Sequence, residues 1–355
     1  MKRVVVAMSG GVDSSVTAYL LKEAGFDVIG LSMDLLEPSC RVEKSDTCCS
    51  LQPFVDARDV ADRLSIPHYI VNCKAEFEQE VVSYFVNEYL NGRTPNPCVV
   101  CNCRIKFGIL LNKAKELGAD ALATGHYARI ERKNSRYVIK KSAEQVKDQS
   151  YFLYRLSQEQ LSQALMPLGE YQKFQVRKIA TRLELKIADK PESQEICFIA
   201  EGNYQKFIQE KLGDTLQHGQ ILDKEGNILG KHQGIALFTV GQRQGLGIAA
   251  GKPLYVIKID PNRNVIIVGE ESDLYSQELT ADEVTWQAFE KLTREIEVTA
   301  RIRYLHKGGQ AVITPLTQKR IKVQFKEPQR AITPGQSIVF YQDDVILGGG
   351  LIDKV

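Results

Sequence analysis

Long hydrophobic runs are absent from this chain of 355 residues. The apolar run that starts at Val4 is far too short for a signal peptide or a membrane span. No later stretch approaches the ~18 apolar residues that a membrane-crossing helix needs. From these absences we expect a cytoplasmic protein without a membrane partner.

A dominant charge, internal repeats and low-complexity segments are absent as well. The 46 Lys and Arg residues nearly balance 44 Asp and Glu residues, so the formal net charge of +2 indicates no particular partner. Hydrophobic residues make up 43% of the chain and charged residues 25%, which excludes disordered and fibrous classes. Between Lys291 and Arg330, however, ten Lys or Arg residues stand against three Glu, an excess of +7. Such a region suits a phosphate-facing surface, and equally an ordinary solvated face.

The first half of the chain alternates β-type and helical patterns. Strands are predicted over Arg3–Ala7, Val28–Met33, His68–Asn72 and Ala121–Thr124, and helices over Ser15–Ala24, Pro53–Leu64, Glu76–Leu90 and Ile105–Leu117. Strands separated by helices form right-handed βαβ units, so we expect a doubly wound parallel sheet covered on both faces.

Beyond about residue 200 the pattern changes to short β-type runs with frequent glycine. Tyr204–Lys211 is the last predicted helix, and Leu254–Ile259 and Val265–Val268 are typical of short strands. Further alternating runs occupy Glu297–Tyr304, Ala311–Thr314, Ile321–Phe325, Ser337–Tyr341 and Val345–Gly349. The pattern predicts three domains: an α/β domain over residues 1–202, a small β-rich domain over 203–270 and a C-terminal β-barrel over 271–355.

The segment Ser9-Gly10-Gly11-Val12-Asp13-Ser14 stands between the first predicted strand and the first predicted helix. Glycines let a backbone approach a phosphate closely, and a helix start offers unpaired N–H groups and a partial positive charge. Ser9 and Ser14 add hydroxyl donors, and Asp13 can orient the loop or approach a magnesium ion. In an open α/β sheet, ligands bind at this carboxyl end of the strands. We therefore expect a phosphate-binding loop here.

Other phosphate-loop signatures do not fit this segment. A Rossmann loop needs G-x-G-x-x-G and a Walker loop needs G-K-[ST], and the segment has neither. A plain strand-to-helix turn is the alternative, because paired glycines and a Ser cap are common in such turns. The hexapeptide resembles the signature of the PP-loop ATP pyrophosphatases, which cleave ATP to AMP and pyrophosphate to adenylate a substrate oxygen. That resemblance implies an ATP-consuming enzyme.

The eight cysteines of a cytoplasmic chain are expected to be mostly reduced thiols, open to reactive or metal-binding roles. Prolines and asparagines predict an irregular segment over Asn91–Cys103, with a helix starting near Arg104. Cys101 would lie just before that helix, where the helix dipole and the cations Arg104 and Lys106 lower a thiol pKa. Because a thiolate is a nucleophile, Cys101 is a candidate catalytic residue.

Structural alternatives exist for these cysteines. Cys98-x-x-Cys101 has the spacing of zinc ligands, and Cys103 could be a third ligand, but the chain offers no second C-x-x-C pair. Cys197, flanked by Ile196 and Phe198, is by itself more typical of a buried core residue.

Six segments occur in a specific order along the chain. They are the phosphate loop, Thr-Pro-Asn-Pro at 94–97 followed by Cys-Asn at 101–102, Ala-Thr-Gly-His-Tyr at 123–127, Lys-Asp-Gln-Ser-Tyr-Phe-Leu at 147–153, the segment around Cys197, and Thr-Pro-Gly-Gln at 333–336. Together they resemble the tRNA-specific 2-thiouridylase family, from Met8 to about Gly350. In that family ATP adenylates the C2 oxygen of the wobble uridine (U34) of tRNA, and sulfur then replaces the activated oxygen.

The resemblance implies a role for each matching residue. It implies ATP binding, with Mg²⁺, at Ala7, Met8, Ser9, Gly10, Gly11, Val12, Asp13, Ser14, Met33 and Gly125. It implies tRNA contacts at Asn96, Pro97, Cys98, His126, Lys147, Asp148, Gln149, Arg303, Tyr304 and Gln336. Cys197 matches the cysteine that carries a persulfide received from a sulfur-donor protein. Cys101 matches the catalytic cysteine that helps to release the sulfur, which leaves a transient Cys101–Cys197 disulfide.

Two consequences follow from the resemblance. A disulfide needs Cα atoms ~4.4–6.8 Å apart, so a loop must move, and the irregular Asn91–Cys103 segment is suited to that motion. Many members of the family carry Asp where this chain has Cys98, and Cys103 is extra. This departure raises the hypothesis, ranked second to the persulfide route, that Cys98, Cys101 and Cys197 hold an iron–sulfur cluster with one iron open to sulfide.

Two other functions stay open. Another PP-loop adenylating enzyme, such as an amidotransferase-type synthetase or a lysidine-forming enzyme, would not need the Cys101 and Cys197 pair. An RNA-binding or ATP-sensing module without catalysis would suit the C-terminal β region alone, but not the full phosphate loop. No role is assigned to Cys40, Cys48, Cys49, Cys73 or Cys103.

Overall fold

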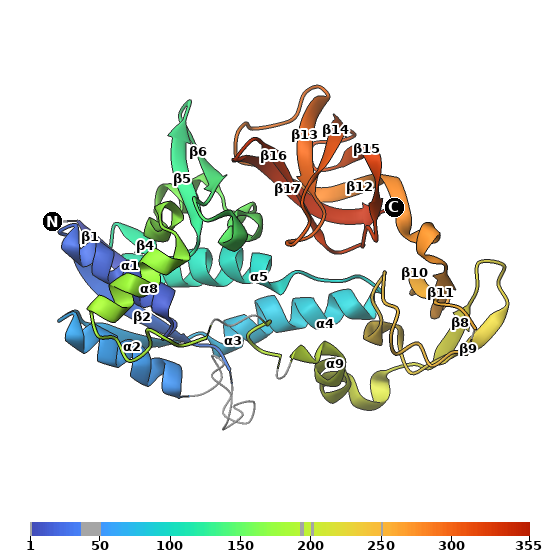
Figure 1. The fold of residues 1–355 in the computed structure, drawn as a ribbon, viewed down its shortest axis with the longest axis horizontal. Coiled ribbons are helices and arrows are strands. Elements are labelled where there is room, and N and C mark those ends of the chain that lie inside the picture. Colours follow the sequence, from blue (N-terminus) through green and yellow to red (C-terminus); the bar gives the residue numbers. More distant parts are fainter. Residues whose placement is uncertain (1, 37–50, 192–194, 200–201, 250) are drawn as a thin grey trace. The chain divides into compact units, whose positions relative to one another are not determined.

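The computed structural model describes residues 2–36, 51–191, 195–199, 202–249 and 251–355 (Figure 1). Its contacts divide the chain into two units. The first unit comprises Met1–Val82, Cys98–Glu201 and Asp344–Leu347, and the second comprises Ser83–Pro97, Gly202–Asp343 and Gly348–Val355. The chain therefore passes between the units five times. The three-domain division drawn from the sequence pattern stays a prediction.

A five-stranded sheet forms the centre of the first unit, in the order β3-β2-β1-β4-β7, with every neighbouring pair parallel. The strands are β1 Arg3–Ala7, β2 Asp27–Asp34, β3 His68–Asn72, β4 Ala121–Ala123 and β7 Ala164–Leu165. Val4, Val5 and Val6 are almost fully buried, as expected of a central parallel strand covered on both faces. The predicted parallel α/β sheet is confirmed.

Helices α1 (Val12–Glu23), α2 (Gln52–Arg63) and α8 (Lys173–Arg182) contribute to the core cluster of this unit. Helix α1 ends as the sequence predicts, because Gly25 takes a φ of +83° that other residues rarely adopt. The sequence patterns do not predict α8. They also miss an antiparallel hairpin, β5 (Ala128–Lys133) and β6 (Arg136–Lys141).

Two further helical stretches each contain a π-helical part. The first runs through α3 Lys74–Phe77, η2 Glu78–Val82 and α4 Ser83–Leu90, and the second through α5 Pro97–Val100, η3 Cys101–Leu110 and α6 Leu111–Glu116. The predicted irregular segment is therefore wrong beyond Asn96. Proline is accepted at the first helical position, where its missing N–H is not needed, so the helix starts at Pro97 rather than near Arg104.

The second unit contains a four-stranded sheet and a closed barrel. The sheet has the order β10-β11-β8-β9, from β8 Gly219–Leu222, β9 Ile228–His232, β10 Tyr255–Asp260 and β11 Val265–Gly269. Helix α9 spans Tyr204–Leu212, close to its predicted range. No helix in the described ranges is long and apolar enough to cross a membrane.

Six strands form the barrel in the order β12-β15-β14-β13-β16-β17, and pairing of β12 with β17 closes the ring (Figure 1). Their bounds are β12 Tyr275–Trp286, β13 Ile296–Arg301, β14 Gly309–Pro315, β15 Ile321–Arg330, β16 Ser337–Gln342 and β17 Val345–Lys354. The predicted C-terminal barrel is confirmed, although the patterns miss β12 and underestimate the lengths of β15 and β17.

Candidate active site

The phosphate loop follows β1 and leads into α1, where the helix N-terminus is open to a ligand. Gly10 has a φ of +69°, and a Cβ on it would overlap the backbone of Pro53, so glycine is required there. The Ser14 hydroxyl accepts a hydrogen bond from Ser9 N at 3.2 Å and donates to Gly11 O at 3.2 Å. These bonds hold the loop in a defined shape before any nucleotide binds.

A cavity of about 250 Å³ opens at this loop, at the carboxyl ends of β1, β2 and β4. It is lined by Ala7, Met8, Ser9, Asp13, Ser14, Leu31, Ser32, Met33, Leu35, Pro53, Phe54, Lys106, Thr124, Gly125, His126 and Gln149. Seven residues expected to bind ATP are thereby brought together: Ala7, Met8, Ser9, Asp13, Ser14, Met33 and Gly125. His126 and Gln149, expected at tRNA, line the same cavity.

Gly125 lies directly against the start of α1 at the edge of this cavity. A Cβ at Gly125 would lie 2.9 Å from Ser14 N and 3.0 Å from Asp13 C. The end of β4 can approach the phosphate loop this closely because residue 125 has no side chain.

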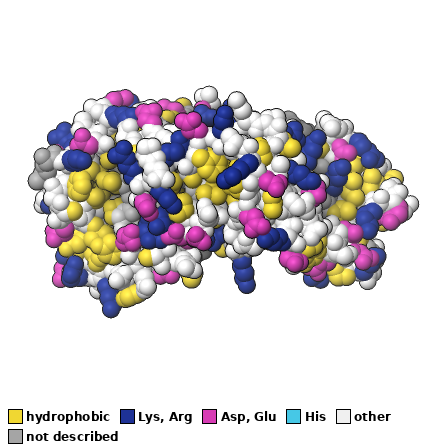
Figure 2. All heavy atoms as spheres, turned by 90° about the horizontal axis from the view of Figure 1, so that it is seen from above, with side chains coloured by type: hydrophobic (Ala, Val, Ile, Leu, Met, Phe, Trp, Pro, Cys, Tyr) yellow, Lys and Arg dark blue, Asp and Glu magenta, His cyan; other side chains and the backbone are white. Residues whose placement is uncertain are grey.

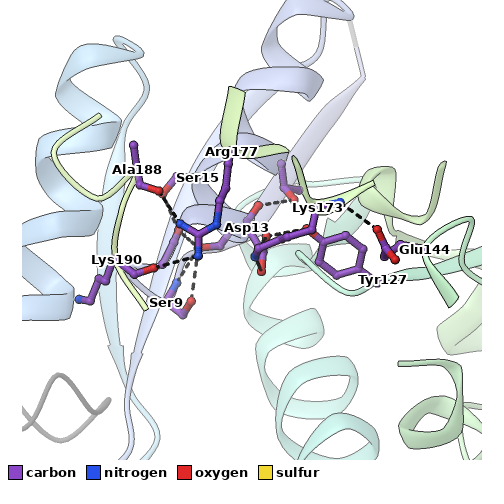
Figure 3. Close-up of polar contacts among 12 residues, drawn as sticks. Ser9, Asp13, Ser15, Tyr127, Glu144, Lys173, Arg177, Ala188 and Lys190 are labelled. Atoms are coloured by element: carbon purple, nitrogen blue, oxygen red, sulfur yellow. Dashed lines mark hydrogen bonds and ion pairs between the residues drawn. The ribbon is translucent and has the colours of Figure 1, made fainter. Parts of the chain in front are cut away.

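Asp13 is held by a lysine and a tyrosine that no sequence pattern singled out as partners. Lys173 Nζ lies 2.7 and 2.8 Å from the two carboxylate oxygens, and Tyr127 Oη donates to Asp13 Oδ1 at 2.8 Å (Figure 3). The Lys173 ammonium also lies 5.6 Å from the centre of the Tyr127 ring. The side chains of Lys173 and Asp13 are 12% and 30% exposed. Their pairing makes the loop carboxylate electrically neutral toward an incoming phosphate.

A second lysine, Lys106, reaches the cavity from η3. Its ammonium donates to Asn102 Oδ1 at 2.9 Å and lies 3.5 Å from His126 Nε2. His126 is buried, and its Nδ1 lies 2.7 Å from Thr124 Oγ1. Burial, and next the Lys106 charge, hold the His126 pKa well below its usual value. The imidazole is therefore neutral at physiological pH, with Nε2 available as an acceptor.

The expected low pKa of Cys101 is wrong. Burial raises the pKa of the Cys101 thiol to about 12, although the Lys106 ammonium acts in the opposite direction. The physical reason is its position: the helix begins at Pro97, so Cys101 lies inside it with 9% of its surface exposed. Desolvation of a thiolate outweighs the nearby cation.

The other described cysteines lie close to Cys101 or near its helix. Cys98 is exposed, Cys197 is half-buried, and their charges both raise the Cys101 pKa, as does that of the buried Cys73. Cys103 is half-buried, with Sγ 3.7 Å from Arg155 O. Cys73, Cys98, Cys101 and Cys103 are thiols that form no disulfide. Cys40, Cys48 and Cys49 lie outside the described residues.

The residues of the first unit that were expected to contact tRNA differ in exposure. Lys147 is half-buried, beside the 83% exposed Val146. Asp148 is buried, and its carboxylate accepts hydrogen bonds from Ser142 N and from both the N–H and hydroxyl of Ser150. This geometry suits a residue that shapes the loop rather than one that touches RNA directly.

The expected tRNA residues of the second unit are likewise engaged within the protein. Asn96 and Pro97 are buried, and Arg303 Nη1 donates to Arg330 O at 3.1 Å. The Gln336 amide donates to two backbone carbonyls. Tyr304 is half-buried at the bend after β13.

The basic excess between residues 291 and 330 is partly compensated. Lys322 pairs with Glu278 at 3.0 Å, Lys326 with Glu297 at 3.2 Å, and Arg330 with Glu271 at 3.1 Å; two of these three carboxylates lie outside the basic stretch. Figure 2 shows Lys and Arg interspersed with Asp and Glu over the face drawn. Part of the positive charge of the basic stretch is therefore neutralised by nearby carboxylates.

The loop, the cavity and the parallel sheet define a protein of the PP-loop class that binds ATP. Family descriptions match in three places: "tRNA methyl transferase HUP domain" at residues 2–201, "tRNA methyl transferase PRC-barrel domain" at 205–270 and "Aminomethyltransferase beta-barrel domain" at 276–352. With the relatives described next, these matches place the chain in the tRNA-specific 2-thiouridylase family, so the resemblance seen in the sequence is confirmed.

Three relatives illustrate the match. The tRNA-specific 2-thiouridylase MnmA 1 of Caldanaerobacter subterraneus is 53% identical over 356 residues, covering 99% of this chain and 98% of the relative. The MnmA protein of Lachnoclostridium phytofermentans is 50% identical over 357 residues, covering 100% of both chains. MnmA 1 of Clostridium botulinum is 49% identical over 354 residues, covering 99% of both.

Proposed function

We propose that this enzyme catalyses the ATP-dependent 2-thiolation of the wobble uridine (U34) of tRNA. The observation that carries the proposal is the presence, in one unit, of a cavity at the phosphate loop and of the neighbouring thiols Cys101 and Cys197. The cavity binds the ATP that activates the uridine C2 oxygen, and the thiols deliver the sulfur that replaces this oxygen.

In the activation step the uridine C2 oxygen attacks the α-phosphorus of ATP, and pyrophosphate leaves. The backbone N–H groups at the start of α1 and the Ser9 and Ser14 hydroxyls bind phosphate oxygens. Mg²⁺ bound to the triphosphate oxygens would neutralise part of their charge, while Asp13, held by Lys173 and Tyr127, orients the loop. Neutral His126 and the Lys106 ammonium stand at the same cavity, where they bind and orient the base or the leaving group.

In the sulfur step Cys197 carries a persulfide received from a donor protein. The terminal persulfide sulfur attacks C2, AMP leaves, and the base is joined to Cys197 through a disulfide bond. A Cys101 thiolate then attacks Cys197 Sγ, the S–S bond breaks toward the base, and 2-thiouridine departs as a Cys101–Cys197 disulfide forms. An external thiol reductant returns both cysteines to thiols. Because burial raises the Cys101 pKa, its deprotonation needs a rearrangement that uncovers the sulfur.

A second route is suggested by the proximity of Cys98, Cys101 and Cys197, whose sulfurs influence one another electrostatically. Three thiols are suitable donors for an iron–sulfur cluster. Among the described residues, however, no group of three Cys, His, Asp or Glu stands in a metal-holding arrangement, so we derive no step through a cluster. Anaerobic purification followed by iron analysis distinguishes the two routes, because an iron-free protein that is active would exclude the iron–sulfur cluster.

The test of the proposal is mass analysis of nucleosides from tRNA incubated with the enzyme, ATP, a persulfide sulfur donor and, for repeated turnover, a thiol reductant. Cys197→Ser and Cys101→Ser should abolish 2-thiouridine formation while retaining pyrophosphate release that depends on unmodified tRNA. Cys103→Ser is the matched control and should keep most of the activity. Full turnover by Cys197→Ser would mean that another PP-loop adenylation is at work. Absence of tRNA-dependent pyrophosphate release would favour a binding module without catalysis.

A further inference from the structure

The barrel segment Thr333-Pro334-Gly335-Gln336 is hydrogen-bonded to the residues just before Asn96. Gln336 Nε2 donates to Thr94 O and to Pro95 O, each at 3.1 Å, which uses both hydrogens of the amide nitrogen. In return, Thr94 N donates to Pro334 O at 2.8 Å. All of these residues belong to the second unit.

Gly335 allows the two segments to approach this closely. It has a φ of +87°, and a Cβ on it would lie 2.9 Å from both Arg93 Cβ and Thr94 N. Neither the backbone conformation nor the space therefore accepts a side chain at this position.

Arg93 ties the same segment to α4 and to β17. Its Nε lies 2.8 Å from Glu88 Oε2, and its Nη1 lies 3.6 Å from Asp353 Oδ1. The three side chains are 26%, 19% and 21% exposed, so these pairs are largely removed from solvent. Ile352 completes the connection, because its N–H donates to Gln336 O at 2.9 Å and its carbonyl accepts from Gly335 N at 2.8 Å.

We propose that Gln336 is a positioning residue, which together with Arg93 and Gly335 forms a clamp that fixes Thr94 and Pro95. Asn96, which the family resemblance implies contacts tRNA, follows directly in the chain, so the clamp sets where Asn96 is presented. This inference rests on the proposed function, and it replaces a direct Gln336–RNA contact by an action through the segment that Gln336 binds. The barrel then takes part in base placement.

Hydrogen exchange in the free protein tests the clamp without any activity assay. Gln336→Ala removes both donated hydrogen bonds, and exchange of the Thr94 amide is expected to accelerate about ten-fold, the usual worth of a hydrogen bond. Gln336→Glu should accelerate it at least as much, because a carboxylate would face two carbonyl oxygens. Gln310→Ala removes an exposed barrel amide that donates to Thr299 Oγ1 and is the matched control, with unchanged exchange. Unchanged Thr94 exchange in Gln336→Ala overturns the proposal.

Kinetics separate positioning from RNA contact. Gln336→Ala should lower kcat for thiolation about ten-fold and change the KM for tRNA by less than about three-fold, because RNA still binds while the base is misplaced. In an Asn96→Ala background the same substitution should cost little more, since it acts through that residue. A raised KM with unchanged kcat would show direct contact and refute the clamp.

Failure of the clamp can be distinguished from failure of the proposed function and from a loss of stability. If the wild-type protein makes no 2-thiouridine, the proposed function fails while the exchange measurement still decides the clamp. If Gln336→Ala lowers the melting temperature by more than the Gln310→Ala control does, Gly335→Ala supplies a second perturbation of the same segment. Its Cβ pushes on Thr94, so faster exchange is again expected, and unchanged exchange overturns the clamp.

Discussion

Replacing Lys173 by Met removes the ammonium that neutralises Asp13 in the phosphate loop. Two charges ~3 Å apart at an effective dielectric constant of ~20 interact by about 5–6 kcal/mol, and breaking a buried pair costs about 3–5 kcal/mol. Asp13 is 30% exposed and keeps its hydrogen bond from Tyr127, so we expect the free energy of unfolding to fall by about 2–3 kcal/mol. The uncompensated carboxylate also repels the triphosphate, and the KM for ATP should rise at least ~10-fold.

The assay is pyrophosphate release at saturating tRNA over a range of ATP concentrations. Lys186→Met is the matched control, because Lys186 pairs with Asp59 at 2.8 Å but is 84% exposed. An exposed pair is worth little, so this variant should change the KM by less than about three-fold. In the double variant Lys173→Met/Asp13→Asn the repulsive charge is absent, and part of the ATP affinity should return.

Two results would refute the reasoning about this pair. A KM for ATP in Lys173→Met within two-fold of wild type would show that Asp13 needs no compensation. A double variant no better than Lys173→Met would show that the lysine acts on ATP in some way other than by neutralising Asp13.

Three further predictions concern the same cavity and its thiols. At pH 8, Cys101 in the free protein should react with iodoacetamide at least ~100-fold more slowly than a free thiol, because burial raises its pKa to about 12. Peptide mass analysis measures the rate of labelling, and a rate equal to that of a free thiol would contradict the burial of Cys101. Because the His126 pKa is lowered in the folded state, unfolding takes up a proton below pH ~6.5, and the free energy of unfolding falls as the pH drops. At pH ~5.5, unfolding of His126→Gln should therefore take up about one proton fewer than unfolding of the wild type. Urea unfolding at several pH values measures this, and equal pH dependence of the two proteins would refute it. Gly125→Ala places a Cβ 2.9 Å from Ser14 N and should raise the KM for ATP at least ~10-fold; an unchanged KM would mean that the loop yields freely.

The parallel sheet was predictable because its central strands are continuous apolar runs punctuated by helices. β12 was not, because its register shifts three times against its neighbours, near Ser276, Thr280 and Asp282. A bulge adds a residue to one strand, so the alternation of buried and exposed residues that marks a half-buried strand is lost.

The phosphate loop was predictable because its residues are contiguous and its chemistry lies in the backbone. Lys173 was not, since the fold brings it to Asp13 from 160 positions away in the sequence. The Cys101 pKa was misjudged for a related reason: the helix start and the burial of the thiol are both set by tertiary packing. Local sequence supplies the cation Lys106 but not the desolvation that outweighs it.

The five passages of the chain between the two units bear on how this protein can be divided or inherited. Phe85 and Tyr89 of α4 are buried. The centre of the Phe85 ring lies 6.0 Å from that of Phe207, and the centre of the Tyr89 ring lies 4.8 Å from that of Tyr204. A fragment that stops at residue 201 would carry the ATP site and yet expose these aromatic rings to water. Such a fragment should self-associate rather than act as a smaller enzyme. Gene truncation or recombination near that point therefore removes more than an accessory domain, and the two units are expected to evolve as a single inheritable whole.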